Sequence, residues 1–237
     1  MSDLEFATLA TLLARDRRSD AVALVDDAAD REYDYRRALT TAWKAGLFFR
    51  NEGVRGGMRV SVADEPIPES ILSFLGAGLL GAVVSFDAPV DAETKALVAP
   101  TGRLNEFDAG PETRQVGYGA EPTDPAVAYW ERDVWSENPT PPPDRPAATD
   151  PLLATDGRTY SHGDLLGAAR NVVDEHDIGV GDHVAVRASL TDPGVVAAGL
   201  LAPLAAGGVV VLRSERRCVF GVGAGPDKTT ILPTDPL

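Results

Sequence analysis

The feature that most constrains the fold is a pattern of strands and helices that occurs twice in the chain. Three pairs of segments match: Arg31–Tyr35 with Arg158–His162, Gly57–Val62 with Gly181–Val186, and Gly81–Val83 with Gly208–Val210. The two members of a pair lie about 124–127 residues apart, and loops of different length absorb that variation. A chain with such a repeat is expected to fold as two lobes of one design.

Each repeat alternates strand and helix periodicity. In the first repeat, apolar residues follow the helical period in Arg36–Asn51 and Pro68–Leu80, and apolar runs of strand length occur at Ala21–Val25, Met58–Val62 and Ala82–Phe86. A strand–helix–strand order joins parallel strands. The predicted fold class is therefore α/β, with two similar parallel-sheet lobes that arise from an internal repeat.

Three domains are predicted from this organisation. They are a first lobe with its connecting segment at residues 1–135, a proline-rich linker at 136–150 and a second lobe at 151–237. Prolines favour an extended spacer, so Pro139–Pro146 are expected to separate the lobes instead of packing in either.

Two further helices are expected outside the repeats. A capping box of Ser2 and Glu5 predicts an opening helix that ends near Arg15. The connecting segment is expected to begin with a short helix at Ala92–Ala99 and to continue as an irregular stretch at Thr101–Glu121.

The formal net charge of −14 limits the classes of partner. Nucleic acids and anionic membranes are themselves polyanions, so neither is an expected partner. Only three lysines occur among the cations (Lys44, Lys95 and Lys228), a balance similar to that of proteins from salt-loving archaea. An acidic surface on a protein from an ordinary environment is the alternative.

A single cysteine, Cys218, excludes a disulfide framework or a thiolate metal site within the chain and fits a reducing, cytoplasmic compartment. No stretch of about 18 apolar residues could span a bilayer, because the longest apolar run, Pro193–Leu212, is broken by Pro203 and Gly207. The same run is expected to form a buried helix followed by a strand.

Two long segments carry a resemblance to a known family. The segment Glu32–Asp87 has a Gly-x-Arg-Val-Ser-Val strand followed by a glycine-rich helix and strand, and Asp150–Leu212 has Leu-Leu-Ala-Pro-Leu before Gly-Gly-Val. They are similar to the first and second lobes of the adenylate-forming superfamily, which includes acyl-CoA synthetases, peptide-synthetase adenylation domains and luciferases. The resemblance implies the fold of the N-terminal part of those enzymes and covers most of the chain.

The family carries a Thr-Ser-Gly-Thr-Thr-Gly-x-Pro-Lys-Gly loop that wraps the phosphates of ATP, followed by Ser-His-x-Asn-Leu. This chain keeps only a remnant, which makes the candidate nucleotide-binding residues Thr155, Asp156, Gly157, Arg158, Ser161 and His162. A phosphate cradle needs several consecutive backbone amides and a cation, whereas one glycine and one arginine remain here. A structural strand, turn and helix with Ser161 as N-cap is the favoured interpretation.

A second candidate site is the segment that matches the acyl pocket of acyl-CoA synthetases. Its residues in this chain are Thr191, Asp192 and Gly194. Asp192 followed by Pro193 is also typical of a helix N-cap and first turn, and this structural role is favoured over an acyl pocket.

Three weaker patterns favour structural roles. His162, His176 and His183 lie in different predicted elements, which argues against a metal site. The Gly221–Gly225 run lacks the strand, turn and helix context of a dinucleotide site. Arg213–Arg217 is explained by a solvated strand end, with anion binding as the alternative.

The leading functional hypothesis is a truncated, non-catalytic relative of these ligases that acts as a binding or regulatory module. The family's β-barrel subdomain and its mobile domain with the catalytic lysine have no counterpart in the sequence, so no catalytic residue is predicted. ATP or AMP with Mg²⁺ is disfavoured as a cofactor, while a protein partner or self-association is expected and a small-molecule ligand is possible. The alternatives are one half of a split adenylating ligase and a small-molecule-binding protein that uses the cleft between the lobes.

Overall fold

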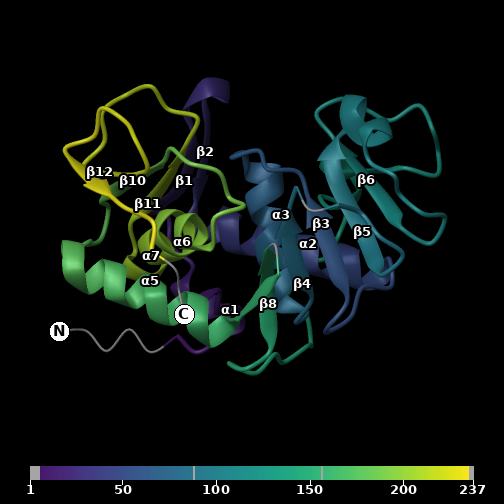
Figure 1. Cartoon of the computed structure of the whole chain (residues 1–237), viewed down its shortest axis with the longest axis horizontal. Coiled ribbons are helices and arrows are strands. Elements are labelled where there is room, and N and C mark those ends of the chain that lie inside the picture. The colour runs from purple at the N-terminus through teal and green to yellow at the C-terminus, as the bar shows by residue number, and fades with distance from the viewer. Residues whose placement is uncertain (1–5, 88, 156, 235–237) are drawn as a thin grey trace.

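Two β-sheets with helices packed between them form the molecule (Figure 1). The computed structural model describes residues 6–87, 89–155 and 157–234. Sheet A has the strand order β13-β12-β10-β11-β1-β2, and sheet B has the order β7-β6-β5-β3-β4-β8-β9. Most neighbours are parallel, and the antiparallel pairs are the hairpins β1–β2 and β8–β9. The predicted α/β class is confirmed.

The strands of sheet A are β1 (Val22–Asp26), β2 (Arg31–Asp34), β10 (His183–Val186), β11 (Val209–Leu212), β12 (Phe220–Val222) and β13 (Thr229–Ile231). The strands of sheet B are β3 (Arg59–Val62), β4 (Val83–Phe86), β5 (Thr94–Pro100), β6 (Arg114–Tyr118), β7 (Ala128–Tyr129), β8 (Pro151–Thr155) and β9 (Arg158–Ser161). The α-helices are α1 (Leu9–Leu12), α2 (Tyr35–Asn51), α3 (Pro68–Leu79), α4 (Trp130–Asp133), α5 (His162–His176), α6 (Pro193–Val195) and α7 (Ala202–Ala206). A π-helical segment, η4 (Val196–Leu201), joins α6 to α7, and short 3₁₀ turns are η1 (Arg15–Arg17), η2 (Asp27–Ala29) and η3 (Thr101–Glu106).

The two halves of the chain exchange their hairpins. Strand β1 of the first half pairs with β11 of the second, where Val25 lies opposite Val211, and β8 of the second half pairs with β4 of the first at Leu153 and Val84. Each sheet is therefore completed by residues from the other half. Both sheets therefore contain strands from residues 1–135 and from residues 151–237. Strand pairing over such distances leaves no local signal in the sequence, so it could not be predicted.

Capping side chains mark the starts of helices α2 and α5. The side chain of Asp34 accepts a hydrogen bond from the Arg37 amide at the start of α2. Ser161 and Asp164 form a reciprocal capping box at the start of α5, which confirms the predicted N-cap. The predicted opening box of Ser2 and Glu5 lies outside the described residues, and α1 begins instead after a box formed by Thr8 and Thr11.

The predicted helix at Ala92–Ala99 is wrong, since this segment contains most of strand β5. Its composition suits a helix, but Leu97 and Val98 are fully buried in the middle of sheet B, between β3 and β6. Burial on both faces of a parallel sheet favours a continuous apolar strand over local helix propensity.

The proline-rich linker also differs from its prediction. Pro142 is buried against Gly46 of α2, and Asp144 forms an ion pair with Arg50 at 3.1 Å. The linker therefore packs along the first half of the chain instead of spacing the halves apart.

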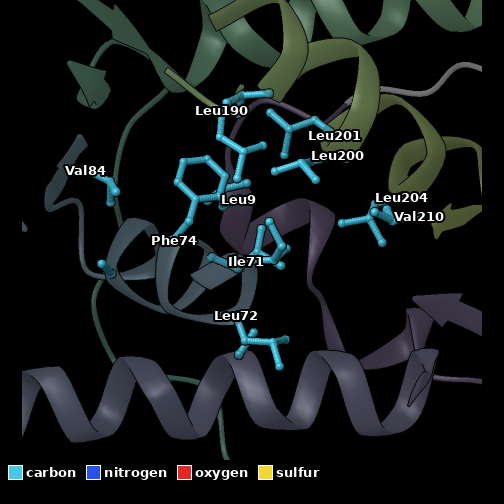
Figure 2. Close-up of a cluster of buried hydrophobic side chains, with 14 of the residues drawn as sticks. Leu9, Ile71, Leu72, Phe74, Val84, Leu190, Leu200, Leu201, Leu204 and Val210 are labelled. Carbon is cyan, nitrogen blue, oxygen red and sulfur yellow. The ribbon is translucent and has the colours of Figure 1, made fainter. Parts of the chain in front are cut away.

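The main core lies between the sheets (Figure 2). Ile71 and Phe74 of α3 lie close to Leu9 of α1 and to Leu200 and Leu201 of η4. Helix α3, buried along its whole length, lies between the two sheets in Figure 1. No helix of the described segments has the length and apolar character needed to cross a membrane.

Helices α2 and α3 approach each other closely at a pair of glycines. A Cβ atom on Gly76 would lie 2.7 Å from the Gly46 amide nitrogen and 2.9 Å from the Ala42 carbonyl oxygen. Both neighbouring atoms belong to the backbone of α2, so the crossing requires glycine at this position.

Candidate functional site

Polar residues from both sheets meet where their parallel strands end. Asp64 follows β3, and its carboxylate accepts hydrogen bonds from the Ser189 hydroxyl and from the Leu190 amide at 2.8 Å, both in the loop after β10. The Asp64 amide in turn donates to Asp87, which follows β4, at 3.0 Å. The carboxyl ends of parallel strands are where α/β proteins bind their ligands, so this junction is the natural place for a site.

A cleft of about 920 Å³ opens beside this junction. It brings together Thr155, Gly157 and Arg158 from the predicted nucleotide segment with Thr191 from the predicted acyl-pocket segment. The first half of the chain supplies the opposite wall, including Arg59, Ser85 and Asp87. Two arginines and several hydroxyl groups thus line one cleft between the halves of the chain.

The charges of the cleft are partly paired. The Arg59 guanidinium lies 2.7 Å from Asp91 and 3.3 Å from Glu93, with all three side chains well exposed to solvent. Arg158 lies over the ring of Tyr160, with 5.7 Å between the guanidinium carbon and the ring centroid. The cleft can therefore offer cationic and hydroxyl groups to a polar ligand.

Strands β8 and β9 are separated by two positions of the sequence. Thr155 lies opposite Arg158 in the antiparallel register, so the hairpin closes with two residues, of which Asp156 lies outside the described part of the chain. Gly157 has a φ of 80°, in the left-handed region that a tight hairpin turn needs. Thr155 and Arg158 belong to the strand ladder, so two positions separate the paired residues, whereas a phosphate loop needs a longer run of consecutive backbone amides.

Ser161 and His162 do not line this cleft. Ser161 caps α5, and His162 is fully buried, with its Nδ1 atom accepting a hydrogen bond from the Leu9 amide at 3.2 Å. Burial lowers the pKa of His162 to about 4, although the nearby Asp150 raises it in part. The histidine is therefore neutral near pH 7 and connects α1 to the start of α5.

The neutral state of His162 makes stability depend on pH. Because the unfolded chain binds a proton near pH 6.5 and the folded chain only near pH 4, this contribution is complete above pH 6.5 and is lost as the pH falls toward 4. We expect the free energy of unfolding to fall by about 2 kcal/mol between pH 7 and pH 5 from this group alone. Denaturant titrations at both pH values, on wild type and on His162→Gln, measure it.

Glutamine can accept the Leu9 hydrogen bond but does not titrate, so His162→Gln should lose this part of the pH dependence. His176→Gln serves as the control, since His176 lies at the far end of α5 and is only half-buried. Equal pH dependence in wild type and in His162→Gln would contradict the assignment.

The remaining residues of the predicted acyl pocket have structural roles. The Asp192 side chain accepts from the Gly194 amide at 2.8 Å and caps α6, as the favoured interpretation of this residue predicted. A Cβ on Gly194 would lie 2.6 Å from the Thr234 carbonyl oxygen, so this glycine is packed against the chain and offers no open space. Of the three predicted residues, Thr191 alone lines the cleft.

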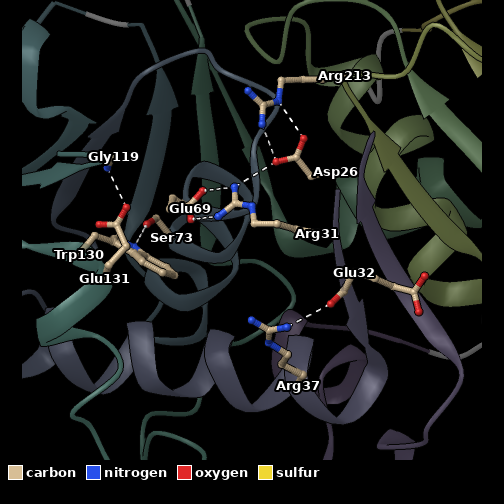
Figure 3. Close-up of polar contacts among 10 residues, drawn as sticks. All are labelled: Asp26, Arg31, Glu32, Arg37, Glu69, Ser73, Gly119, Trp130, Glu131 and Arg213. Atoms are coloured by element: carbon tan, nitrogen blue, oxygen red, sulfur yellow. Dashed lines mark hydrogen bonds and ion pairs between the residues drawn. The ribbon is translucent and has the colours of Figure 1, made fainter. Parts of the chain in front are cut away.

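An ion network around two buried carboxylates connects sheet A to helix α3, and no sequence pattern pointed to it (Figure 3). Arg31 of β2 forms a two-bond pair with Glu69 of α3, at 2.5 and 2.9 Å, and also reaches Asp26 at 3.0 Å. Arg213, after β11, adds two bonds to Asp26 at 2.9 and 2.6 Å. Burial raises the pKa of Asp26, but the bonds from Arg213 and Arg31 outweigh it, so the pKa lies below its ordinary value.

Glu131 lies on the sheet B side of this network (Figure 3). Its carboxylate accepts from the Gly119 amide at 2.7 Å, and burial raises its pKa. Trp130, the next residue toward the N-terminus, donates from its indole nitrogen to Ser73 of α3 at 2.9 Å. These contacts hold α4 against α3 and against the loop that follows β6.

The weaker sequence patterns do not assemble a site. His162 and His176 lie at opposite ends of α5, and no group of three or more His, Cys, Asp or Glu suited to a metal ion exists among the described residues. The Gly221–Gly225 run begins inside β12 and leads to strand β13 instead of a helix. In the Arg213–Arg217 segment, Arg213 and Arg216 pair with Asp26 and Asp27.

Comparison with known proteins gives fold relatives but no sequence relatives. No protein-family model matches the sequence, and no curated protein matches it. Among solved structures, the anthranilate CoA ligase AuaEII in complex with anthranoyl-AMP is 18% identical, with a TM-score of 0.74 over 89% of this chain and 45% of that chain. The N-terminal domain of FACL13 from Mycobacterium tuberculosis is 16% identical, with a TM-score of 0.71 over 88% of this chain and 58% of that one.

Apo MatB from Rhodopseudomonas palustris gives a similar match, with 16% identity and a TM-score of 0.69 over 88% of this chain and 45% of that one. The chain thus spans about half the length of the structures that it matches. At these identities the likeness concerns the fold. The chain has an α/β fold of the acyl-CoA synthetase type, that of the N-terminal domain of adenylate-forming ligases.

Proposed function

We propose that this chain is a non-adenylating binding module that holds a small organic carboxylate in the cleft between β4, the β8–β9 turn and the loop before α6. The observation that carries the proposal is the two-residue turn between Thr155 and Arg158. A module that adenylated its ligand through the family's phosphate loop would need a longer segment at this place.

The residues that line the cleft favour a carboxylate ligand over a nucleotide. None of the three lysines lines it, because Lys44 bonds to the Trp135 carbonyl, Lys95 lies at a different pocket and Lys228 lies beside Cys218. The cations that line the cleft are Arg158 and Arg59, and the pairs of Arg59 with Asp91 and Glu93 are exposed to solvent. Both arginines can bind a carboxylate, and Phe86 and Pro193 supply apolar contact. The aryl acid named for AuaEII makes anthranilate a suitable first probe, with hexanoate as the alkyl counterpart.

Calorimetric titration in molar KCl tests the proposal. We expect saturable heat with anthranilate or hexanoate and none with Mg-ATP or AMP up to millimolar concentration. Thr191→Trp should abolish carboxylate binding because the indole fills the cleft, while Thr123→Trp, an exposed position outside the cleft, should leave it unchanged. Saturable Mg-ATP binding would support the alternative, one half of a split ligase, and either that result or the absence of any carboxylate binding overturns the proposal.

Self-association or a protein partner, expected from the sequence, remains a prediction for this module. Sedimentation velocity at several protein concentrations measures it, and a monomer at all of them contradicts self-association.

A further inference from the structure

The face of sheet A that points away from the helices carries a cavity of about 500 Å³. Leu24 and Val210, paired side by side, belong to the main core, so their neighbours Val25 and Val211, also paired, point to the opposite face. Val211 belongs to a small apolar cluster on that face, and Val25 packs against it. The floor of the cavity is therefore apolar and is built on rigid central strands.

One wall of this cavity is the loop between β11 and β12, and buried charges hold that loop in place. Arg187 and Asp227 form an ion pair at 2.7 Å in which both side chains are at least nine-tenths buried. Arg187 also donates to the carbonyl oxygens of Ser214 and Arg216, and Asp227 accepts from the Cys218 amide at 2.9 Å. The wall is thus fixed before any ligand arrives, which lowers the entropic cost of binding.

Charges of opposite sign lie on opposite walls. The β1–β2 hairpin contributes Asp30 and Glu32, and the β11–β12 loop contributes Arg217. Arg31 of the hairpin also lines the cavity, but its charge is paired with Asp26 and Glu69. The side chains of Asp30, Glu32 and Arg217 have no hydrogen-bond or ion-pair partner among the described residues, whereas Asp27 and Arg216 in the same lining pair with each other at 2.9 Å. Figure 3 shows the Glu32 carboxylate turned away from the Asp26–Arg31–Glu69 network.

We propose that this cavity binds a zwitterion with an apolar body, of which an aromatic or branched α-amino acid is the simplest example. Its carboxylate pairs with Arg217, its ammonium group pairs with Glu32 or Asp30, and its side chain covers Val25 and Val211. A floor without charge between two oppositely charged walls discriminates against ligands that carry one charge alone, because one wall then stays unpaired. This site is separate from the carboxylate cleft of sheet B and does not depend on the function proposed for that cleft.

The sole cysteine of the chain provides a reporter for this site. Cys218 is half-buried and lines the cavity, so a bound ligand should slow its reaction with a thiol reagent such as dithionitrobenzoate. Burial raises the pKa of the Cys218 thiol, so the reaction is best followed in mildly alkaline buffer, where more of the reactive thiolate is present. Calorimetry of the same probes measures affinity independently of the thiol.

Three probes that differ by one charge test the proposal: phenylalanine, 3-phenylpropionate and 2-phenylethylamine. Phenylalanine should protect Cys218 saturably, and the other two should protect it at least about tenfold more weakly, since each lacks one charge-assisted contact. Protection of Cys218 is the quantity compared, because 3-phenylpropionate can also enter the carboxylate cleft of sheet B, which Cys218 does not line. The proposal is overturned if phenylalanine gives no saturable protection of Cys218 up to millimolar concentration, or if either singly charged probe protects Cys218 as well as phenylalanine does.

Variants assign the binding to this cavity. Arg217→Gln and Glu32→Gln should each weaken phenylalanine binding about tenfold or more, and both residues are exposed, so the fold should be unaffected. Arg158→Gln, in the cleft of sheet B, is the matched control and should leave the protection of Cys218 by phenylalanine unchanged. Loss of binding in Arg158→Gln together with full binding in Arg217→Gln would place the ligand in the other cleft and refute the proposal.

Discussion

Replacing Arg31 with methionine is expected to lower the free energy of unfolding by about 3 kcal/mol. Methionine keeps most of the aliphatic length but removes the charge that faces two buried carboxylates. The side chains of Asp26 and Glu69 are 0% and 5% exposed, and Glu69 has no other ion-pair partner among the described residues. Asp26 retains Arg213, so most of the cost comes from Glu69. Chemical denaturation at pH 7 measures the change.

Two further variants separate the buried charge from other effects of Arg31→Met. Arg36→Met removes an arginine from a pair with Asp20 in which both side chains are more than half exposed, and it should cost less than about 1 kcal/mol. Adding Glu69→Gln to Arg31→Met should recover part of the lost stability, because the unpaired buried charge is then removed. Equal losses in Arg31→Met and Arg36→Met would show that the network contributes nothing.

Gly76→Ala is expected to destabilise the protein by about 3 kcal/mol, although alanine is the better helix former. The added methyl group would lie 2.7 Å from both the Ala45 Cβ and the Gly46 amide nitrogen. These atoms belong to α2, which cannot move away without opening the core between α2 and α3. Thermal or chemical unfolding of the variant measures the loss.

Gly167→Ala is the matched control for this prediction. Gly167 also lies inside a helix, α5, but a Cβ there would meet nothing within 4 Å. Alanine should therefore stabilise the protein by up to about 1 kcal/mol through helix propensity alone. Opposite signs for the same substitution in two helices would isolate the steric effect of the crossing, and a similar outcome in both helices would contradict it.

The sequence could predict the elements better than their assembly. Periodicity placed α2 and α3 within one residue of their observed ends, because amphipathic spacing and capping are local properties. It failed at Ala92–Ala99, where burial between two strands decided the structure. The exchange of hairpins was not predictable, since the partners Val25 and Val211 lie far apart in the chain and many strand orders suit the same pattern.

The candidate site shows the same division. Ser161 and Asp192 were recognised as helix caps because a cap is defined by its immediate neighbours. The ion network was missed, because Arg31 and Glu69 become partners only when the hairpin of sheet A is placed over the start of α3. The cleft in sheet B was found in part, since its residues Thr155 and Arg158 came from the resemblance, while Arg59 and Asp87 came from the fold alone.

The exchange of hairpins has a consequence for how the chain acquires its structure during synthesis. A ribosome releases β1 and β2 well before β11, the strand on which they dock, because β11 lies in the second half of the chain. The first half therefore emerges with an unpaired hairpin and with the edge of β4 uncovered until β8 arrives. Nascent chains halted before Val209 should accordingly be sensitive to proteases and bound by chaperones, and protection should arrive late and in one step.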